Sequence, residues 1–147
     1  GRGIRDAHLV SQYLREESIN ADYFSMCSSP ATRALHTALI FAKNLGVPAS
    51  KVAIDDELYH SSAEEILDVV RKTSDMCDAA MYFAHNPGIS DLVHMLLHTD
   101  VHEELPADMP TLGVSQLMFT GDWQDLAPNT CELTSYLSPK RTRLNVN

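Results

Sequence analysis

The fold of this chain is decided by one stretch, Ala79-Ala80-Met81-Tyr82-Phe83-Ala84, which runs directly into His85-Asn86-Pro87-Gly88. A continuous apolar run of this length, ended by a turn, is typical of a strand buried on both faces of a parallel sheet. A helical pattern from about Ile89 to His98 follows the turn. The stretch therefore predicts a strand, a tight polar turn and a helix in direct succession.

The same succession is predicted earlier in the chain. Tyr23 to Cys27 reads as a short strand, and a helix that starts at Ser28-Ser29-Pro30 and ends at about Leu45 follows it. Serine suits the N-cap of that helix, proline is tolerated at its first position, and Gly46 supplies the stop. In open parallel sheets, ligands bind beyond the carboxyl ends of the strands, so both polar turns are expected at one edge.

The remaining segments extend this pattern to an α/β domain. They are a helix over Gly3–Glu17, a short strand over Lys51–Ile54, a helix with capping-box spacing after Ser61 and Ser62, and two late strands, Leu112–Thr120 and Cys131–Leu137. Helices that alternate with strands favour a three-layer sandwich with a mostly parallel central sheet and helices on both faces. No linker divides the chain, so residues 1–147 are expected to form a single domain.

The composition argues against several classes of function. The formal net charge of −9 disfavours a nucleic-acid or anionic-membrane partner, because such binding needs clustered Lys and Arg. No apolar run approaches the ~20 residues of a membrane span. The first residues lack the apolar stretch of a signal peptide. The three cysteines form no CxxC pair, which favours a reducing cytoplasm as the location.

Two residues at the predicted sheet edge are candidates for binding an anion. Arg33 lies in the first turn of its helix, where a cation opposes the helix dipole, and a bound dianion would reverse the sign of that effect. His85 directly follows a buried strand, where it can donate to a phosphoryl oxygen or move a proton near neutral pH. The alternatives are a solvated Arg33 and a His85 that is hydrogen-bonded to backbone at a strand end.

A group of polar side chains on the next helix has the spacing of a metal site. His94 and His98 are separated by four residues, with Asp91 and His102 in phase, and such spacing can bind zinc. The leucines and valine between them define the core side of the helix, which places the histidines on its solvated flank. We therefore expect no metal and no cofactor.

The motifs at the predicted edge resemble those of a known family. Ser28-Ser29-Pro30-Ala31-Thr32-Arg33-Ala34-Leu35-His36-Thr37-Ala38 resembles the SSPxxRAxxTA motif of the histidine phosphatase superfamily. His85-Asn86-Pro87-Gly88 resembles the second-histidine motif of SixA, a branch of small phosphohistidine phosphatases. Further matches lie at residues 3–7, 56–60 and 110–111, so the resemblance covers nearly the whole chain.

The resemblance implies a phosphoglycerate-mutase-like fold and a phosphoryl transfer in two steps. In the family, a histidine near the N-terminus attacks phosphorus, and water then releases phosphate from the resulting phosphohistidine. By the same resemblance, Arg33 would bind the phosphate and His85 would be the catalytic residue that stabilises its equatorial oxygens. Phosphoryl transfer needs such positioning and charge neutralisation more than covalent help.

The chain departs from the family at its nucleophile. The family carries this histidine in an Arg-His-Gly or Arg-His-Ala motif at the end of the first strand, and no such motif occurs here. The histidines other than His85 are expected in helices or unrelated turns: His8, His36, His60, His94, His98 and His102. We therefore expect that the first strand is missing and the domain is truncated at its N-terminus, because a parallel core without that strand would expose unpaired edges.

The leaving group distinguishes between the candidate substrates. Larger members of the family supply an acidic residue after a strand near the middle of the chain, and by this resemblance Glu57, beside Asp55 and Asp56, is the candidate general acid. The alternative is a solvated acidic turn before a helix. A phosphoramidate leaves with less protonation than an alkoxide, and the short chain has no insertion that could form a lid. The expected partner is therefore a signalling protein that carries phosphohistidine. The alternatives are a phosphomonoesterase for small substrates such as sugar phosphates, and a non-catalytic module that binds phosphorylated partners through Arg33.

Overall fold

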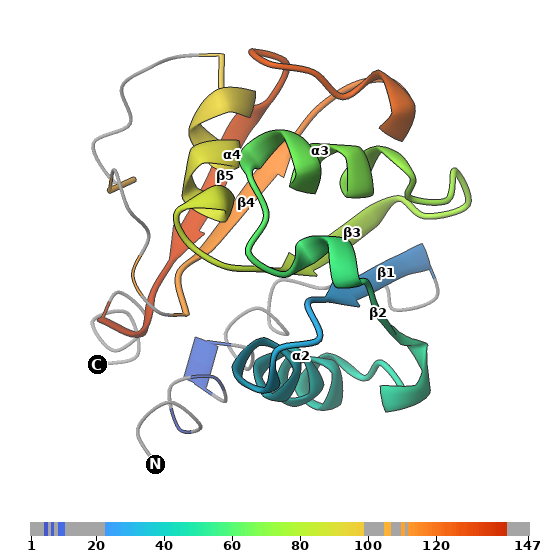
Figure 1. The fold of residues 1–147 in the computed structure, drawn as a ribbon, viewed down its shortest axis with the longest axis vertical. Coiled ribbons are helices and arrows are strands. Elements are labelled where there is room, and N and C mark those ends of the chain that lie inside the picture. The colour runs from blue at the N-terminus through green and yellow to red at the C-terminus, as the bar shows by residue number, and fades with distance from the viewer. Residues whose placement is uncertain are drawn as a thin grey trace.

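The computed structural model describes residues 5, 7, 9, 10, 23–98, 105, 106, 110 and 112–140, and these include a parallel sheet (Figure 1). The sheet consists of β1 (Phe24–Ser28), β2 (Val52–Ile54) and β3 (Ala79–Phe83), in the order β2-β1-β3. Ser28, the last residue of β1, pairs with Ile54 and with Phe83, which are the last residues of its two neighbours. All three strands therefore end at one edge of the sheet.

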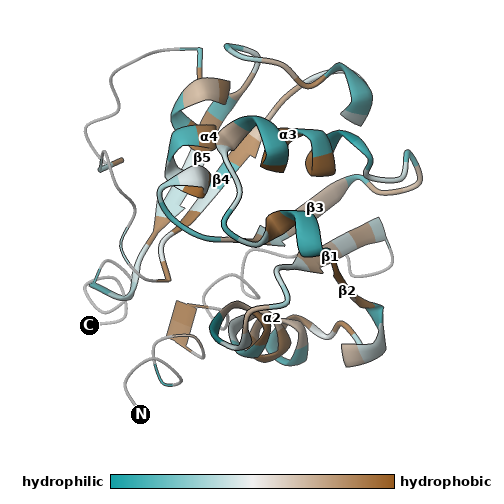
Figure 2. Cartoon of the chain, viewed as in Figure 1, coloured by the Kyte–Doolittle hydropathy of each residue, from teal (hydrophilic) through white to brown (hydrophobic). Residues whose placement is uncertain are grey.

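Helices cover both faces of this sheet, as predicted. The helix α2 (Thr32–Leu45) lies on one face, while α3 (Ala63–Arg71) and α4 (Gly88–Leu96) lie on the other (Figure 1). Met26 of β1 packs in the core beneath α2, whereas the next residue, Cys27, packs in the core beneath α3 and α4. This alternation along the strand produces the three layers. Hydrophobic and hydrophilic residues alternate along α2 and α3, as expected for helices with one buried side (Figure 2).

The start of α2 differs from the prediction. The helix begins at Thr32 after the N-cap Ala31, which makes no side-chain cap hydrogen bond within the described residues. The predicted serine cap is wrong because the Ser29 hydroxyl is bonded to the Ala31 N–H, at 3.2 Å, and to His85. The predicted end is confirmed, since Gly46 has a φ of 80° and a ψ of 22°, a left-handed conformation that suits glycine.

The capping box predicted before α3 is confirmed. Ser62 Oγ accepts a hydrogen bond from the Glu65 N–H at 3.2 Å, and the Ser62 N–H donates to Glu65 Oε1 at 3.1 Å. These bonds satisfy N–H groups that the first turn of a helix otherwise leaves unpaired. The predicted apolar stripe of α3 is buried as well, at Ala63, Ile66, Leu67 and Val70.

The two late strands are also confirmed. The strands β4 (Val114–Met118) and β5 (Glu132–Leu137) pair in an antiparallel arrangement, with a register irregularity between Gln116 and Leu117. A parallel bridge between Leu97 and Cys131 connects the end of α4 to the start of β5. This bridge places the late strand pair beside the α4 side of the domain.

The strand β3 is less buried than predicted. Ala79 is exposed and the other residues of β3 are half-buried. In the part of the chain that the structure describes, β3 pairs with β1 alone, so its second edge has no strand beside it. The prediction of a parallel strand is confirmed, and the prediction of full burial on both faces is wrong.

Most of the helix predicted over Gly3–Glu17 lies outside the described residues. The described residues in this range, Arg5, Ala7, Leu9 and Val10, are helical. Ala7 and Val10 are buried in the core beneath α2, together with Met26 and Phe41. Among the helices described here, none is long and apolar enough to cross a membrane.

Candidate active site

Backbone hydrogen bonds hold the loops after β1 and β2 against the ends of neighbouring strands. The Ser29 N–H donates to the Phe83 carbonyl at 2.9 Å, and the Asp55 N–H donates to the Ser28 carbonyl at 3.0 Å. The first bond holds the loop after β1 against the end of β3, and the second holds the loop after β2 against the end of β1. The two polar turns predicted at one sheet edge therefore do lie together, and the loop after β2 joins them.

A serine and a histidine make the central side-chain contact of this edge. His85 Nε2 lies 2.8 Å from Ser29 Oγ, and Ser29 is 0% exposed. Ser29 Oγ also accepts the Ala31 N–H, so its hydroxyl hydrogen is free to point towards the imidazole. Because Ser29 is fully buried, it is a group that orients the His85 ring rather than one that meets a substrate.

The turn that carries His85 is packed tightly against the loop after β2. Ser90 Oγ donates to Asn86 Oδ1 at 2.5 Å, and the peptide bond between Asn86 and Pro87 is cis. Gly88 is buried, and a Cβ at this position would lie 2.1 Å from the Ser61 carbonyl oxygen. Glycine is required here because only a residue without a side chain allows this close approach of the two loops.

The loop after β2 brings two further aromatic rings to His85. The rings of Tyr59 and His60 have centroids 4.1 Å apart, and the Tyr59 ring lies 5.8 Å from that of His85. The centroids of the His60 and His85 rings are also 5.8 Å apart, with an angle of 31° between their planes. The prediction that His60 lies in an unrelated turn is therefore wrong. Its turn follows a strand parallel to β1, so the topology carries it to the same edge.

The electrostatic environment of this edge favours an anion. Burial lowers the pKa of His85, and the nearby His60 lowers the same pKa further, so His85 is neutral at neutral pH. The N-termini of α2 and α4 begin directly after the loops of Ser29 and His85, and neither has a side-chain cap within the described residues. The positive ends of the two helix dipoles attract negative charge.

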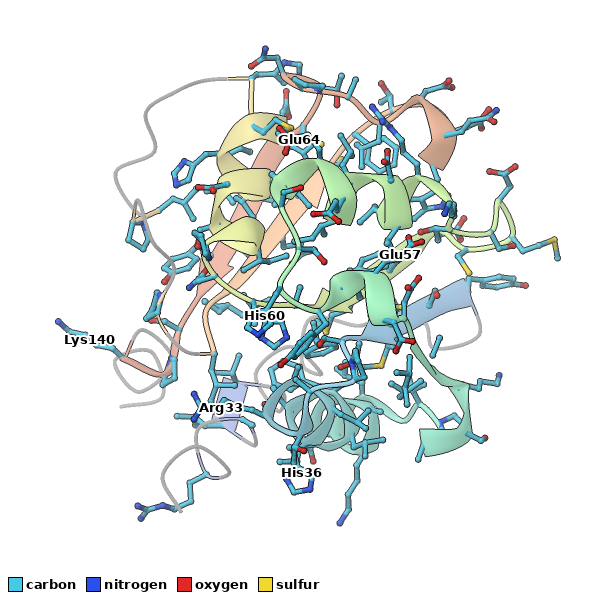
Figure 3. All side chains as sticks on the ribbon, viewed as in Figure 1. Arg33, His36, Glu57, His60, Glu64 and Lys140 are labelled. Atoms are coloured by element: carbon cyan, nitrogen blue, oxygen red, sulfur yellow. The ribbon has the colours of Figure 1, made fainter. Side chains whose placement is uncertain are left out.

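Arg33 occupies the first turn of α2, as predicted, and its residue is exposed. Figure 3 shows Arg33 at the end of α2 that lies on the same side of the molecule as His60. The contacts described here place no carboxylate on its guanidinium, so its charge is available to a ligand. No described contact joins the Arg33 and His85 side chains directly, and their shared role stays a prediction.

Glu57 lies apart from the other two predicted residues. Its backbone N–H donates to Asp55 Oδ1 at 2.9 Å and so starts a single 3-10 turn over Asp56–Leu58. Its carboxylate is 3.8 Å from Lys72 Nζ at the end of α3, and both side chains are mostly exposed. Figure 3 shows Glu57 separated from Arg33 and His60. The role of Glu57 as a general acid stays a prediction, and its ion pair fits a solvated acidic turn.

The histidines of α4 do not form a metal site with the residues that the structure describes. No three His, Cys, Asp or Glu side chains among the described residues are arranged to hold a metal ion. His94 Nε2 lies 3.0 Å from the Pro106 carbonyl oxygen and is exposed. His102 lies outside the described residues.

Residues 1–65 match the family model described as histidine phosphatase superfamily (branch 1). This region includes the motif around Arg33 and the turn that carries His60. Among curated proteins, none matches the chain. This match supports the resemblance over residues 1–65, and the motif at His85 lies outside the matched region.

Solved structures share the fold over most of the chain. A putative phosphohistidine phosphatase SixA from Nakamurella multipartitia has a TM-score of 0.77 and 24% identity, and the match covers 92% of this chain and 81% of that one. A protein histidine phosphatase SixA complexed with tungstate has a TM-score of 0.72 and 17% identity, over 95% and 83% of the two chains. A putative SixA from Agrobacterium tumefaciens has a TM-score of 0.71 and 20% identity, over 92% and 79%. These matches confirm the predicted α/β fold.

Proposed function

We propose that this chain is a phosphatase domain that removes phosphate from phosphohistidine on a signalling protein, through a phosphohistidine enzyme intermediate. The observation that carries the proposal is the 2.8 Å contact between Ser29 and His85, which joins the two motif loops at the edge where α2 and α4 begin. The match of residues 1–65 to the histidine phosphatase superfamily supports the reaction class. The SixA structures with this fold support a phosphoprotein as the substrate.

The roles of the site residues follow from the charges of phosphoryl transfer. The guanidinium of Arg33 grips two oxygens of the phosphoryl group, as its planar fork allows. The imidazole of His85 donates to the equatorial oxygens, on which negative charge is spread during the transfer. One SixA of this fold is complexed with tungstate, a tetrahedral oxyanion like phosphate, which supports an oxyanion as the ligand.

The attacking histidine is proposed to lie in an Arg-His-Gly or Arg-His-Ala motif on a strand that precedes residue 1. Such a motif is absent from residues 1–147. Among the described residues, β3 has no partner on its second edge, and a parallel strand added there would end beside His85. A neutral imidazole at that position is a competent nucleophile near pH 7.

The position of Glu57 favours a phosphoramidate over a phosphate ester as the substrate. An ester leaves as an alkoxide and needs a proton donor, whereas the Glu57 carboxylate is turned towards Lys72. Sugar-phosphate hydrolysis that is lost in Glu57→Gln but kept in Glu64→Gln would favour the phosphomonoesterase alternative. Both residues are exposed: Glu57 lies before α3, and Glu64 lies in its first turn (Figure 3). Glu64→Gln is therefore a matched control.

The cytoplasm is the proposed location. Cys27, Cys77 and Cys131 all lie within the described residues, and all three are free thiols. Unpaired cysteines are typical of reducing compartments. Phosphohistidine signalling proteins in the same compartment would then be accessible to the domain.

The direct test is release of phosphate from a phosphohistidine-bearing domain by the protein that includes the Arg-His motif. We expect Arg33→Ala and His85→Ala each to lower the rate by about 100-fold or more, the usual cost of removing a group that stabilises transition-state charge. Lys43→Ala is the control, because Lys43 is an exposed cation in the last turn of the same helix as Arg33. Unchanged rates in both Arg33→Ala and His85→Ala would contradict the site assignment.

A further inference from the structure

We propose that His60 is a second anion-binding imidazole of this site, which donates an N–H to the same phosphoryl group as His85. The inference rests on the proposed function, since both concern one phosphate site. It assigns the contact to a residue on the loop after β2, whereas Arg33 lies in the first turn of α2 and His85 on the loop after β3.

The two rings are close enough to reach one ligand. The centroids of the His60 and His85 rings are 5.8 Å apart. Their planes are only 31° from parallel. Two imidazoles in this arrangement can each donate one N–H to different oxygens of a tetrahedral anion.

The backbone of His60 adopts a conformation that needs an explanation. Its φ is +50°, in the left-handed region that few residues other than glycine adopt. The turn is held in place from both sides, since the Ser61 hydroxyl contacts the Tyr59 and Glu57 carbonyls and the Tyr59 ring packs on the imidazole. Backbone conformations of this kind, imposed by their surroundings, cluster at ligand-binding sites.

The charges around the pair favour an anion as the occupant. Burial lowers the pKa of His85, and the charge of the nearby His60 lowers it further. A phosphate dianion that contacts both rings offsets this repulsion, and the positive ends of the helix dipoles of α2 and α4 add to the attraction. A metal cation is disfavoured, because no third ligand accompanies the two histidines in the described part of the chain.

The test is the binding of inorganic phosphate, and separately of tungstate, to the intact protein, followed by NMR of the histidine side chains. His60→Gly is the informative variant, because glycine adopts a φ of +50° readily and removes the imidazole without straining the turn. We expect this variant to fold with unreduced stability and to bind phosphate roughly tenfold more weakly, as expected for the loss of one charge-assisted hydrogen bond. His60→Asn, which keeps an N–H donor and tolerates the left-handed backbone, should recover part of the affinity.

The control is His36→Ala, which removes an exposed imidazole from the side of α2 that faces away from His60 (Figure 3). Its affinity for phosphate should equal that of the unchanged protein. Equal affinity in His60→Gly, with a loss in His85→Ala, would overturn the role of His60 and leave the proposed function standing. Failure of the unchanged protein to bind either anion would overturn both.

Discussion

The two ends of the parallel sheet differ in what the chain places there. At the carboxyl ends, Ser28 and Ser29 are 0% exposed, and backbone hydrogen bonds hold the loops after β1 and β2 against the ends of β3 and β1. At the amino ends, Tyr23 is 51% exposed and Met76 is 79% exposed. The comparison shows that helix N-termini and polar turns meet where the parallel strands finish, which is the end at which the site is proposed.

The largest effect on stability is expected at the carboxyl end, where Gly88 packs against the Ser61 carbonyl. Alanine at Gly88 would bring its Cβ to 2.1 Å from the Ser61 carbonyl oxygen, and this backbone atom has no rotamer with which to move away. We expect Gly88→Ala to lower the free energy of unfolding by about 3 kcal/mol, which urea denaturation measures.

Gly46→Ala provides the matched control for this substitution. A Cβ at Gly46 has open space around it, so the cost comes from the φ of +80° alone and should be about 1 kcal/mol. Equal losses in the two variants would show that the loops of Ser61 and Gly88 yield easily, and the carboxyl end would then be less rigid than the structure indicates.

A smaller effect is expected from the serine that orients His85. Ser29→Ala leaves His85 Nε2 without its 2.8 Å partner in a partly buried position, which should cost about 1–3 kcal/mol of stability. Nitrogen chemical shifts of the imidazole should report the change in its hydrogen bonding. Ser74→Ala is the amino-end counterpart, since Ser74 is exposed, and we expect its cost to stay within about 0.5 kcal/mol. If the two variants are equally stable, the contact between Ser29 and His85 adds nothing to the free energy of unfolding.

The pH dependence of stability tests the histidine pair. Because the pKa of His85 is lowered from the ordinary value of 6.5, the unfolded chain binds this proton more tightly than the folded chain. The contribution of His85 to stability is therefore complete above pH 6.5 and declines as the pH falls from 6.5 towards the folded-state pKa. Denaturation measured on both sides of this pH should show the decline.

His60→Ala sharpens the same test. We expect it to raise the pKa of His85 in an NMR titration, but not to 6.5, because burial is the larger cause of the lowered value and remains in the variant. His36→Ala should leave the pKa of His85 where it is. A pKa that does not respond to His60→Ala would show that the two rings are electrostatically independent.

The smallest effect is expected at the amino end of the sheet. Met76→Gln replaces a side chain that is 79% exposed, so the free energy of unfolding should change by no more than about 0.5 kcal/mol. Phosphate affinity should not change at all. A loss of phosphate affinity in this variant would contradict the distinction between the two ends, because it would show that a residue at the amino end affects ligand binding.

Local signals in the sequence predicted most of the fold. The capping box of Ser62 and Glu65, the stop at Gly46 and the strand before His85 each depend on residues that are neighbours in the chain. Such short-range patterns carry their own physical cause, so they survive into the tertiary structure. Local patterns also predicted the late strand pair. They did not predict the register irregularity between Gln116 and Leu117.

The candidate site was predicted in part, for the same reason. Arg33 and His85 belong to motifs of adjacent residues, whereas His60 comes near His85 through the packing of the loops after β2 and β3. The serine expected to cap α2 instead contacts a histidine far along the chain. Glu57 was predicted because larger members of the family carry an acidic residue after a strand near the middle of the chain, whereas its contact with Lys72 joins residues of different elements. Contacts between distant residues depend on topology, which periodicity does not encode.

The fit of Gly88 beneath the Ser61 carbonyl has a practical consequence for protein engineering. Because Gly88 packs directly against the Ser61 carbonyl, residues 59–61 and 85–88 have to fit each other. Variants in which only one of the two segments is changed are expected to lose this packing and to fold less stably. Exchanging both segments together, with Gly88 retained, is the design rule that follows for anyone who wishes to redirect the specificity of this scaffold.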